Sequence, residues 1–490
     1  PTLTIDKCTL IAGTEDHNTG TFGSLNITRN GQILAEGAAT KPIVYTAMQE
    51  AEATLQRDID GINPGGPFLP LDPQDPASQG KWGGVIVLGS APINWFDGST
   101  QLTETFIEGL PQGDPRSLYG GADPADNSGV LRYVSIQFGG FLLGANNEIN
   151  GLTLGGVGNC TTIEFVEVIG NSDDGVEFFG GTVNTRCMVV AFCSDESVDY
   201  DQGHQGCHQF HFTIQSKTSD NGTEADGGDG INTPDKDQKP YTLTTVHNAT
   251  YIGSPSSAGG LGNDSFRLKD NFAGQWHNSV FHDFAGHAVR IDDLDTEAQV
   301  GGNLLINNTH WGVFGGGATN SGGSKQAEVD LFNGTGNTAI NTNPDLRLLT
   351  RDGTTDEVTA IDPRPASTSP LLVSNGATLT PVDPNKSCFA EVPYRGAFGP
   401  GECWADCWTY LAKKGILFPR AAQNIVVVGS DITGNTTWTK NNFYVLNKPI
   451  YVEAGNTLTI EAGTQIFGAE DTTNGTFGSL IVTRGAEIQA

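Results

Sequence analysis

The stretch from Asn171 to His211 holds the densest group of side chains that could do chemistry in this chain. Its carboxylates are the candidate metal ligands, namely Asp173, Asp174, Glu177, Asp195, Asp199 and Asp201. Where equivalent positions of neighbouring strands stack about 5 Å apart, such carboxylates repel one another unless a cation lies between them. Calcium accepts about six to eight oxygen ligands at irregular geometry, so the cluster predicts calcium as the cofactor.

A simpler interpretation of the same stretch stays open. Asp side chains in turns often accept hydrogen bonds from the nearby backbone, and Asp-Asp-Gly is common in turns. The stretch also contains His204, His208 and His211, whose spacing suits one face of a helix. Because the segment has the pattern of strands and loops, we do not expect these histidines to bind zinc.

The elements that must position these residues are short strands separated by Gly, Asn and Asp. Runs such as 84–89, 131–138 and 163–168 are apolar or alternate apolar with polar residues, as strands do. Helical periodicity is confined to residues 48–56 and 404–414. We find no repeat of about 100 residues, which immunoglobulin-type sandwiches would give. The predicted fold is all-β, a right-handed parallel β-helix (solenoid) with loop insertions.

A long internal repeat sets the domain organisation. Residues 3–35 recur at residues 458–490, at an offset of 455, with 18 of 33 positions identical. The chain therefore ends with the start of a second copy, and it opens inside a strand-like run. We predict a processed subunit or part of a longer tandem protein, with neither tip of the β-helix capped.

Three domains are predicted from this organisation. They are a parallel β-helix over residues 1–387, a terminal segment and connector over 388–424, and a final segment over 425–490. The final segment is either the opening coils of a second β-helix unit or a subunit-docking segment. The polar stretches 58–80 and 217–239 are predicted loop insertions.

Several longer motifs resemble a known family. They are residues 81–94, 123–134, 148–158, 171–184, 361–370 and 394–398. Together they resemble large secreted bacterial surface proteins with a right-handed parallel β-helix domain, of the Bacteroidota-type lipoprotein or type IX secretion cargo kind. The resemblance covers nearly all of residues 1–420 and again 425–490. It implies a β-helix fold and an exported location, and says little about activity.

The cysteines predict disulfides formed in an oxidising compartment, since their number is even and none forms a CxxC pair. They are Cys8, Cys160, Cys187, Cys193, Cys207, Cys388, Cys403 and Cys407. Several depart from the family pattern, which implies local cross-links. Cys388 would pair with Cys403 or Cys407, and the remaining one with Cys8. Cys187 and Cys193 would pair across coils with Cys160 or Cys207, and buried thiols are the alternative.

Asn-X-Ser/Thr triplets permit glycosylation of an exported protein. The candidate sites are Asn26, Asn221, Asn248, Asn263, Asn333 and Asn435. Trp82, Trp95, Phe178, Phe179, Trp276 and Trp311 could form a sugar-binding face, although packing in the core is the commoner role of such residues.

An enzymatic function has weak support in the sequence. Pectinase-type glycosidases share the β-helix fold and use paired Asp residues, a Gly-His loop and an Arg-x-Lys. The chain offers 173–174, 203–204 and 267–269 for these parts. The parts are widely spaced, and β-helix lyases, which use calcium with a Lys or Arg base, fit no better. We therefore assign no catalytic residue and predict that the protein is not an enzyme.

The overall charge narrows the possible partners. A net charge of −30 repels nucleic acid and anionic lipid. No stretch approaches the roughly 18 apolar residues of a membrane span. The bare tips of a β-helix carry unpaired backbone groups that recruit other chains.

The sequence therefore predicts a structural subunit of an extracellular or cell-surface filament. Its partners would be copies of itself, joined head to tail or as tandem units. The alternative is a carbohydrate-binding surface adhesin whose partners are surface glycans, and a β-helix polysaccharide hydrolase or lyase is less favoured.

Overall fold

The structure is a computed structural model of the 490-residue chain. It describes all residues except 17–20, 58, 60–67, 142–148, 232–238, 257–261, 385, 402, 418–423, 440–441, 462–463 and 472–475. The predicted connector and both predicted insertions therefore lie partly outside the described residues. The chain divides into two compact units, Pro1–Leu417 and Phe418–Ala490, which we call unit 1 and unit 2.

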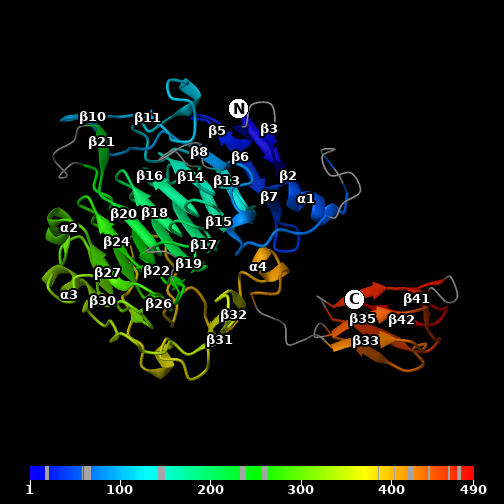
Figure 1. Ribbon diagram of the computed structural model, residues 1–490. Coiled ribbons are helices and arrows are strands. Elements are labelled where there is room, and N and C mark those ends of the chain that lie inside the picture. The colour runs from blue at the N-terminus through cyan, green and yellow to red at the C-terminus, as the bar shows by residue number, and fades with distance from the viewer. Residues whose placement is uncertain are drawn as a thin grey trace. The chain divides into compact units, whose positions relative to one another are not determined.

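Unit 1 is built on two long parallel sheets (Figure 1). The strands of the larger sheet follow the order β1 (Thr2–Ile5), β6 (Gln32–Glu36), β13 (Gly129–Gln137), β15 (Thr162–Ile169), β17 (Asn184–Ala191), β19 (Cys207–Ile214), β22 (Thr245–His247), β25 (Gln275–His277) and β28 (Leu305–Asn307). Beside this path lie β2 (Leu10–Gly13), β7 (Ile43–Ala47), β23 (Thr250–Ile252), β26 (Val280–His282) and β29 (His310–Trp311).

The second sheet of unit 1 is parallel throughout. Its strands follow the order β30 (Gly317–Thr319), β27 (His287–Ile291), β24 (Arg267–Lys269), β20 (Thr223–Asp226), β18 (Val198–Asp201), β16 (Val176–Phe179), β14 (Leu152–Gly155), β8 (Gly84–Leu88) and β5 (Ser24–Ile27). Val176 pairs with Val198, 22 residues on, and Trp276 pairs with Ile306, 30 residues on. Such regular steps between parallel partners are the coils of a parallel β-helix, which confirms the predicted fold.

The coils bend at a column of residues in the left-handed backbone region. At successive levels of the larger sheet it contains Tyr133, Phe165, Cys187, Phe210, Asn248, Asn278 and Asn308, with φ between 50° and 61°. This region is costly for aromatic residues and easier for Asn. The rings of Tyr133 and Phe165 stack with centroids 4.5 Å apart, which helps to offset that cost.

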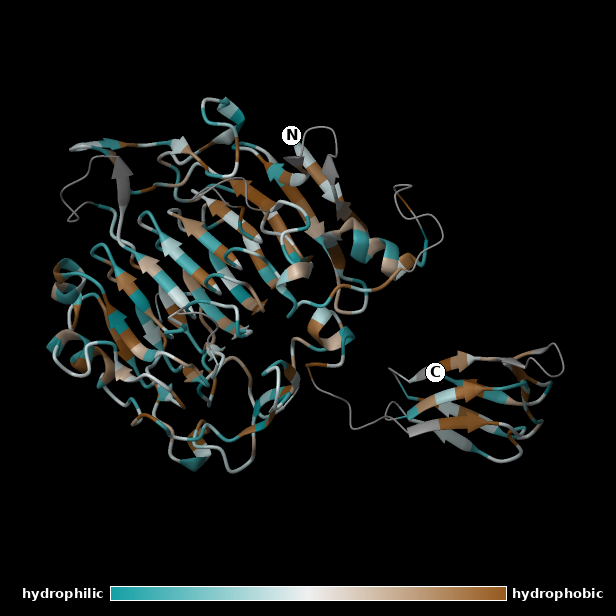
Figure 2. Ribbon diagram, viewed as in Figure 1, coloured by the Kyte–Doolittle hydropathy of each residue, from teal (hydrophilic) through white to brown (hydrophobic). Residues whose placement is uncertain are grey.

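Apolar side chains fill the interior of the coils. Phe178, Tyr200, Trp276 and Trp311 are fully buried, and Trp82 is almost so. The rings of Phe178 and Tyr200 stack 5.1 Å apart. These aromatic residues therefore belong to the core and do not form a sugar-binding face. Figure 2 shows the same hydrophobic character along the strands of both units.

Four helices are present in the described residues: α1 (Met48–Leu55), α2 (Leu294–Gln299), α3 (Gln326–Phe332) and α4 (Tyr410–Lys413). Helices α1 and α4 confirm the two predicted ones. Helix α3 packs against β27, β28 and β30 at the last coils. Its Glu328 is fully buried and accepts hydrogen bonds from the backbone N–H groups of Ile291 and Ser321. The prediction that neither tip is capped is therefore wrong for this tip.

After the antiparallel pair β31 (Leu346–Arg351) and β32 (Val358–Pro365), the chain returns along the coils. We call residues 366–417 the strap. The Asn278 amide exchanges hydrogen bonds with the Thr380 backbone, and Asn248 donates to the Tyr394 carbonyl. The Glu167 carboxylate accepts from the backbone N–H of Tyr410 at the start of α4. The strap thus runs from the last coils back towards the first.

Unit 2 is a short parallel coil stack of its own. Its strands are β33 (Asn424–Val428), β34 (Thr436–Trp438), β35 (Asn442–Leu446), β36 (Pro449–Val452), β37 (Thr457–Ile460), β38 (Gln465–Gly468), β41 (Ser479–Val482) and β42 (Glu487–Gln489). They pair in the orders β33-β35-β38, β34-β37-β42 and β36-β41. Trp438, Tyr444, Ile450 and Leu458 form its core.

The remaining short elements lie in loops of the two units. They are β3 (Glu15–Asp16), β4 (Thr21–Phe22), β9 (Trp95–Asp97), β10 (Thr100–Leu102), β11 (Thr105–Phe106), β12 (Leu118–Tyr119), β21 (Asp229–Ile231), β39 (Glu470–Asp471), β40 (Thr476–Phe477) and the 3₁₀ helices Pro76–Ser78, Pro115–Ser117 and Val373–Asn375.

Candidate functional site

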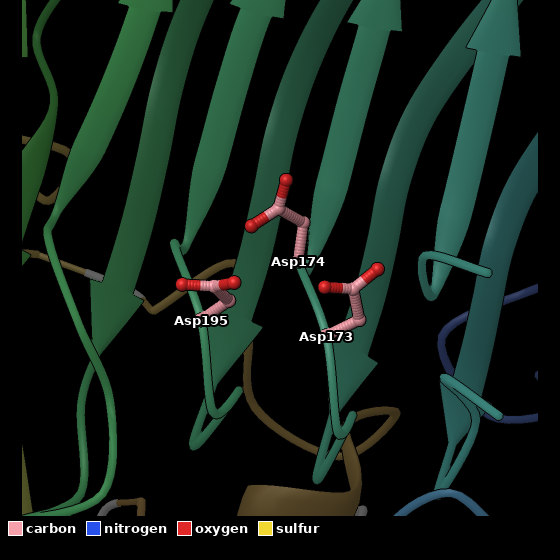
Figure 3. A group of neighbouring side chains, drawn as sticks. All are labelled: Asp173, Asp174 and Asp195. Atoms are coloured by element: carbon pink, nitrogen blue, oxygen red, sulfur yellow. The ribbon is translucent and has the colours of Figure 1, made fainter. Parts of the chain in front are cut away.

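Carboxylates from three successive coils meet where the chain enters β16, β18 and β20. Three groups each place three carboxylate oxygens within 4.8 Å of one another: Asp173, Asp174 and Asp195; Asp174, Glu177 and Asp199; Asp195, Glu196 and Asp220. Figure 3 shows the first group on adjacent loops. Of the six predicted ligands, Asp201 alone is in none of the three groups, while Glu196 and Asp220 were not predicted.

The parallel register continues this cluster as a row across the second sheet. Glu177 pairs with Asp199, Asp199 with Glu224, and Glu224 with Arg267. We call these four residues and their charged neighbours the carboxylate row. Paired residues of parallel strands project on the same side of a sheet and lie about 5 Å apart. The sequence signal for the row was the coil step, which puts chemically similar residues at one height.

The two ends of the carboxylate row differ in charge balance. Arg267 forms ion pairs with Glu224 at 3.2 Å and with Asp292 at 3.0 Å. Lys269 contacts Glu224 and lies 3.3 Å from Asp226. At the other end, Asp174, Glu177 and Asp199 face one another without such a cation among the described residues. Positive charge is therefore missing at the acidic end.

Burial and like charge raise the pKa values of the acidic end. For Asp174, burial has the larger effect and the neighbouring Glu196 adds to it. The pKa values of Glu177 and Asp199 are also raised, first by burial and then by other carboxylates. The pKa of Asp226 is raised to about 7 by burial, against the opposing effect of Lys269. Each group is thus stabilised by a proton or a cation.

The hydrogen bonds leave room for a cation at this end. Asp174 Oδ1 accepts from the backbone N–H of Glu196 at 2.9 Å, on the next coil and not in its own turn. The amide of Asn150 donates to Glu177. The buried Oδ1 of Asp199 has no hydrogen-bond partner. An all-oxygen set of three carboxylates fits a hard cation such as calcium better than zinc. Asp174, Glu177 and Asp199 would hold it.

The three histidines lie inside the coils and form a neutral polar ladder. His204 Nε2 and His208 Nε2 are 3.0 Å apart, and Thr185 Oγ1 lies 2.7 Å from both His208 Nδ1 and His211 Nε2. Burial lowers the pKa of His204 to about 4 and that of His211 to about 3. Among the described residues, no group of metal-binding size contains them. His204 is therefore not combined with the carboxylates into a pectinase-type site.

One disulfide joins described residues, between Cys207 on β19 and Cys388 on the strap. The predicted pairing of Cys388 with Cys403 or Cys407 is therefore wrong, as is a partner for Cys207 among Cys187 and Cys193. Those two thiols are buried, which raises the pKa of each to about 12. The pairing was out of reach of the sequence because the return path of the strap decides it.

Burial also narrows the glycosylation candidates. The Asn221, Asn248 and Asn263 side chains are at most 1 % exposed and hydrogen-bonded to Glu196, Gln209 and Gln215 respectively. A buried amide cannot carry a glycan in the folded protein. The exposed candidates are Asn26, Asn333 and Asn435.

The repeated coil meets different partners in the two units. In unit 1, β1, β2 and β5 pair towards the following coil, with β6, β7 and β8, and among the described strands have no partner on the other side. In unit 2, the equivalent strands β37, β38 and β41 pair towards the preceding coil, with β34, β35 and β36. The same sequence element therefore has two pairing edges, and each unit uses a different one in full.

Comparison with known proteins gives one match. Residues 72–345 match the family model described as a pectate-lyase-like beta helix domain. No curated protein and no solved structure matches the chain. None of the helices in the described residues has the length and apolar character needed to cross a membrane.

Proposed function

The chain belongs to the family of the pectate-lyase-like β-helix domain, and from this premise we propose that it is a structural subunit that assembles head to tail through coil edges. The proposal is carried by the repeated coil, which is paired on opposite edges in the two units. An open parallel edge pairs readily with another strand. A contact of this kind that does not close on itself produces a filament.

The capped tip of unit 1 limits how copies can join. Because α3 covers the last coils, the open edge of unit 1 is the one formed by β1, β2 and β5. The other contributor to the contact is unit 2 of a second copy, which contains the same repeated coil. We place the filament outside the cell or at the cell surface, in keeping with the resemblance to Bacteroidota-type exported proteins. The Cys207–Cys388 disulfide and the exposed Asn-X-Ser/Thr sites support this location.

Electron microscopy of the full chain tests the assembly. We expect filaments that persist on dilution, and sedimentation of most of the protein. Leu3→Asp introduces a charge on the open edge and should leave mainly single chains. Leu69→Asp is the matched control, because Leu69 is 72 % exposed and lies outside the edge. A wild-type chain that stays monomeric at high concentration would end this proposal.

The carboxylate row favours a second candidate, a calcium-dependent site for acidic polysaccharide. The family description contains the name of a lyase, and Asp174, Glu177 and Asp199 offer oxygens for a cation that could bridge to sugar carboxylates. A lyase would release unsaturated sugar ends, which absorb ultraviolet light, only when calcium is present. A surface adhesin would retain the polysaccharide without product. Absence of both results, or their persistence in Asp199→Asn, rejects this candidate.

A further inference from the structure

We propose that residues 424–452 of one copy, the lead-in coil, dock on β1, β2 and β5 of a second copy in the register that they use inside their own unit. The inference rests on the proposed head-to-tail assembly and names its contact. Its partner is a second copy of this chain, recognised through the repeated coil that both units contain.

The burial of equivalent residues shows which surface is missing from each unit. Leu3 and Leu458 are the same position of the repeat, yet Leu3 is 42 % exposed and Leu458, covered by β34, is fully buried. The reverse holds one strand later. Ile33, covered by β13, is 1 % exposed, and its equivalent Ile488 is 44 % exposed. Unit 1 therefore lacks the cover that the lead-in coil gives in unit 2.

The backbone groups of the open edge point the right way to receive that cover. The Gln32 N–H donates to the Pro1 carbonyl, and at the repeated position the Glu487 N–H donates to the Asn456 carbonyl. Since bonding groups alternate sides along a parallel strand, Thr2 and Thr4 direct theirs away from β6. The equivalent residues of β37 direct theirs towards β34. The two copies thus match in strand direction and in hydrogen-bond phase.

The pairing inside unit 2 supplies the register of the contact. Thr437 pairs with Thr459, which corresponds to Thr4. Tyr451 pairs with Ile481, which corresponds to Asn26. We therefore expect Thr437 of one copy beside Thr4 of the next, and Tyr451 beside Asn26, on two different sheets.

Docking exchanges one copy of the repeated coil for the other. The lead-in coil leaves residues 457–490 of its own chain and pairs with residues 2–27 of the neighbour. Exchange of like elements between copies is a low-cost route to association. The neighbour's coil is also better supported, because β6, β7 and β8 already cover its other edge.

Cross-linking between singly substituted full-length chains tests the register. The exposed Cys8, Cys160 and Cys407 are first replaced by Ser in every chain. Chains with Thr4→Cys or Asn26→Cys are then mixed with chains carrying Thr437→Cys or Tyr451→Cys, and a short bis-maleimide is added. We expect dimers from the pairs 4 with 437 and 26 with 451. The crossed pairs, 4 with 451 and 26 with 437, should give at least tenfold less.

Matched proline variants test the exchange itself, monitored through the pair 26 with 451. Thr4→Pro removes an outward N–H from the open edge and should lower the yield at least tenfold. Thr459→Pro removes the equivalent N–H from the coil that the lead-in coil must leave, so the yield should rise. If filaments form but matched and crossed pairs react alike, this register is overturned and assembly by another contact stands. If neither filaments nor dimers form, both proposals fail.

Discussion

The two copies of the repeated coil have closely similar sequences and opposite exposed edges. In unit 1 the coil begins a long stack, and its open side precedes β1. In unit 2 it ends a short stack, and its open side follows β38 and β41. Eighteen of 33 shared residues fix the strands and their inward face, while the neighbouring coil decides which residues are buried. Burial is thus a property of the stack and not of the repeat.

The largest test of this comparison is a cavity at one position of the repeat. Leu458→Ala removes a fully buried side chain and should destabilise unit 2 by about 2–5 kcal/mol. Leu3→Ala, at the same position of a dilute single chain, should cost much less because Leu3 is largely solvated. Urea unfolding measured for both variants decides the point. Equal losses would mean that Leu3 is already covered in the single chain.

A second test sharpens the contrast between the interiors of the units, since all nine histidines lie in unit 1. Thr185→Val removes the hydroxyl that His208 and His211 share, which should destabilise unit 1 by about 1–3 kcal/mol and leave unit 2 unchanged. The lowered histidine pKa values mean that native stability is full above about pH 6.5 and is lost as pH falls. Thermal unfolding between pH 8 and 5 measures both effects, with Thr213→Val as the control on β19.

The next test reverses the first one with a smaller change. Ile33→Val should destabilise unit 1 by about 0.5–1.5 kcal/mol, because Ile33 is buried under β13. Ile488→Val, at the exposed equivalent position, should be nearly neutral. If Ile488→Val costs as much as Ile33→Val in denaturant titrations, an additional coil covers β42 in solution.

The smallest expected effect concerns charge, which concentrates in unit 1. In a chelator at pH 7, Asp199→Asn should stabilise unit 1 by on the order of 1 kcal/mol, because it removes a buried charge among like charges. The raised pKa of Asp199 makes its contribution favourable below about pH 4 and lost as pH rises through the folded-state pKa, so the gain should vanish in acid. Calcium should raise the melting temperature of the wild type and not of the variant. A calcium response that survives in Asp199→Asn would place the cation elsewhere.

The sequence was sufficient for the fold because the strand period and the turn residues repeat at every coil. It also located the acidic cluster, since a coil step of 22 residues brings Glu177 beside Asp199. It did not separate the inside of a coil from the outside, and so His204 and Asp174 could not be assigned to different environments. It also missed α3 as a cap, and the partners of Cys207 and Asn248 on the strap, because distant segments decide these contacts.

The strap gives this protein a defined order of maturation. Its contacts join Glu167 to Tyr410 and Gln209 to Ala390, and a disulfide joins Cys207 to Cys388. A ribosome or an export channel releases these strap residues only after every coil that they cross has emerged. The coils can wind while synthesis continues, whereas the side that the strap covers closes at the end. A chain truncated before residue 388 would therefore keep that side open, so docking of the strap marks a finished molecule.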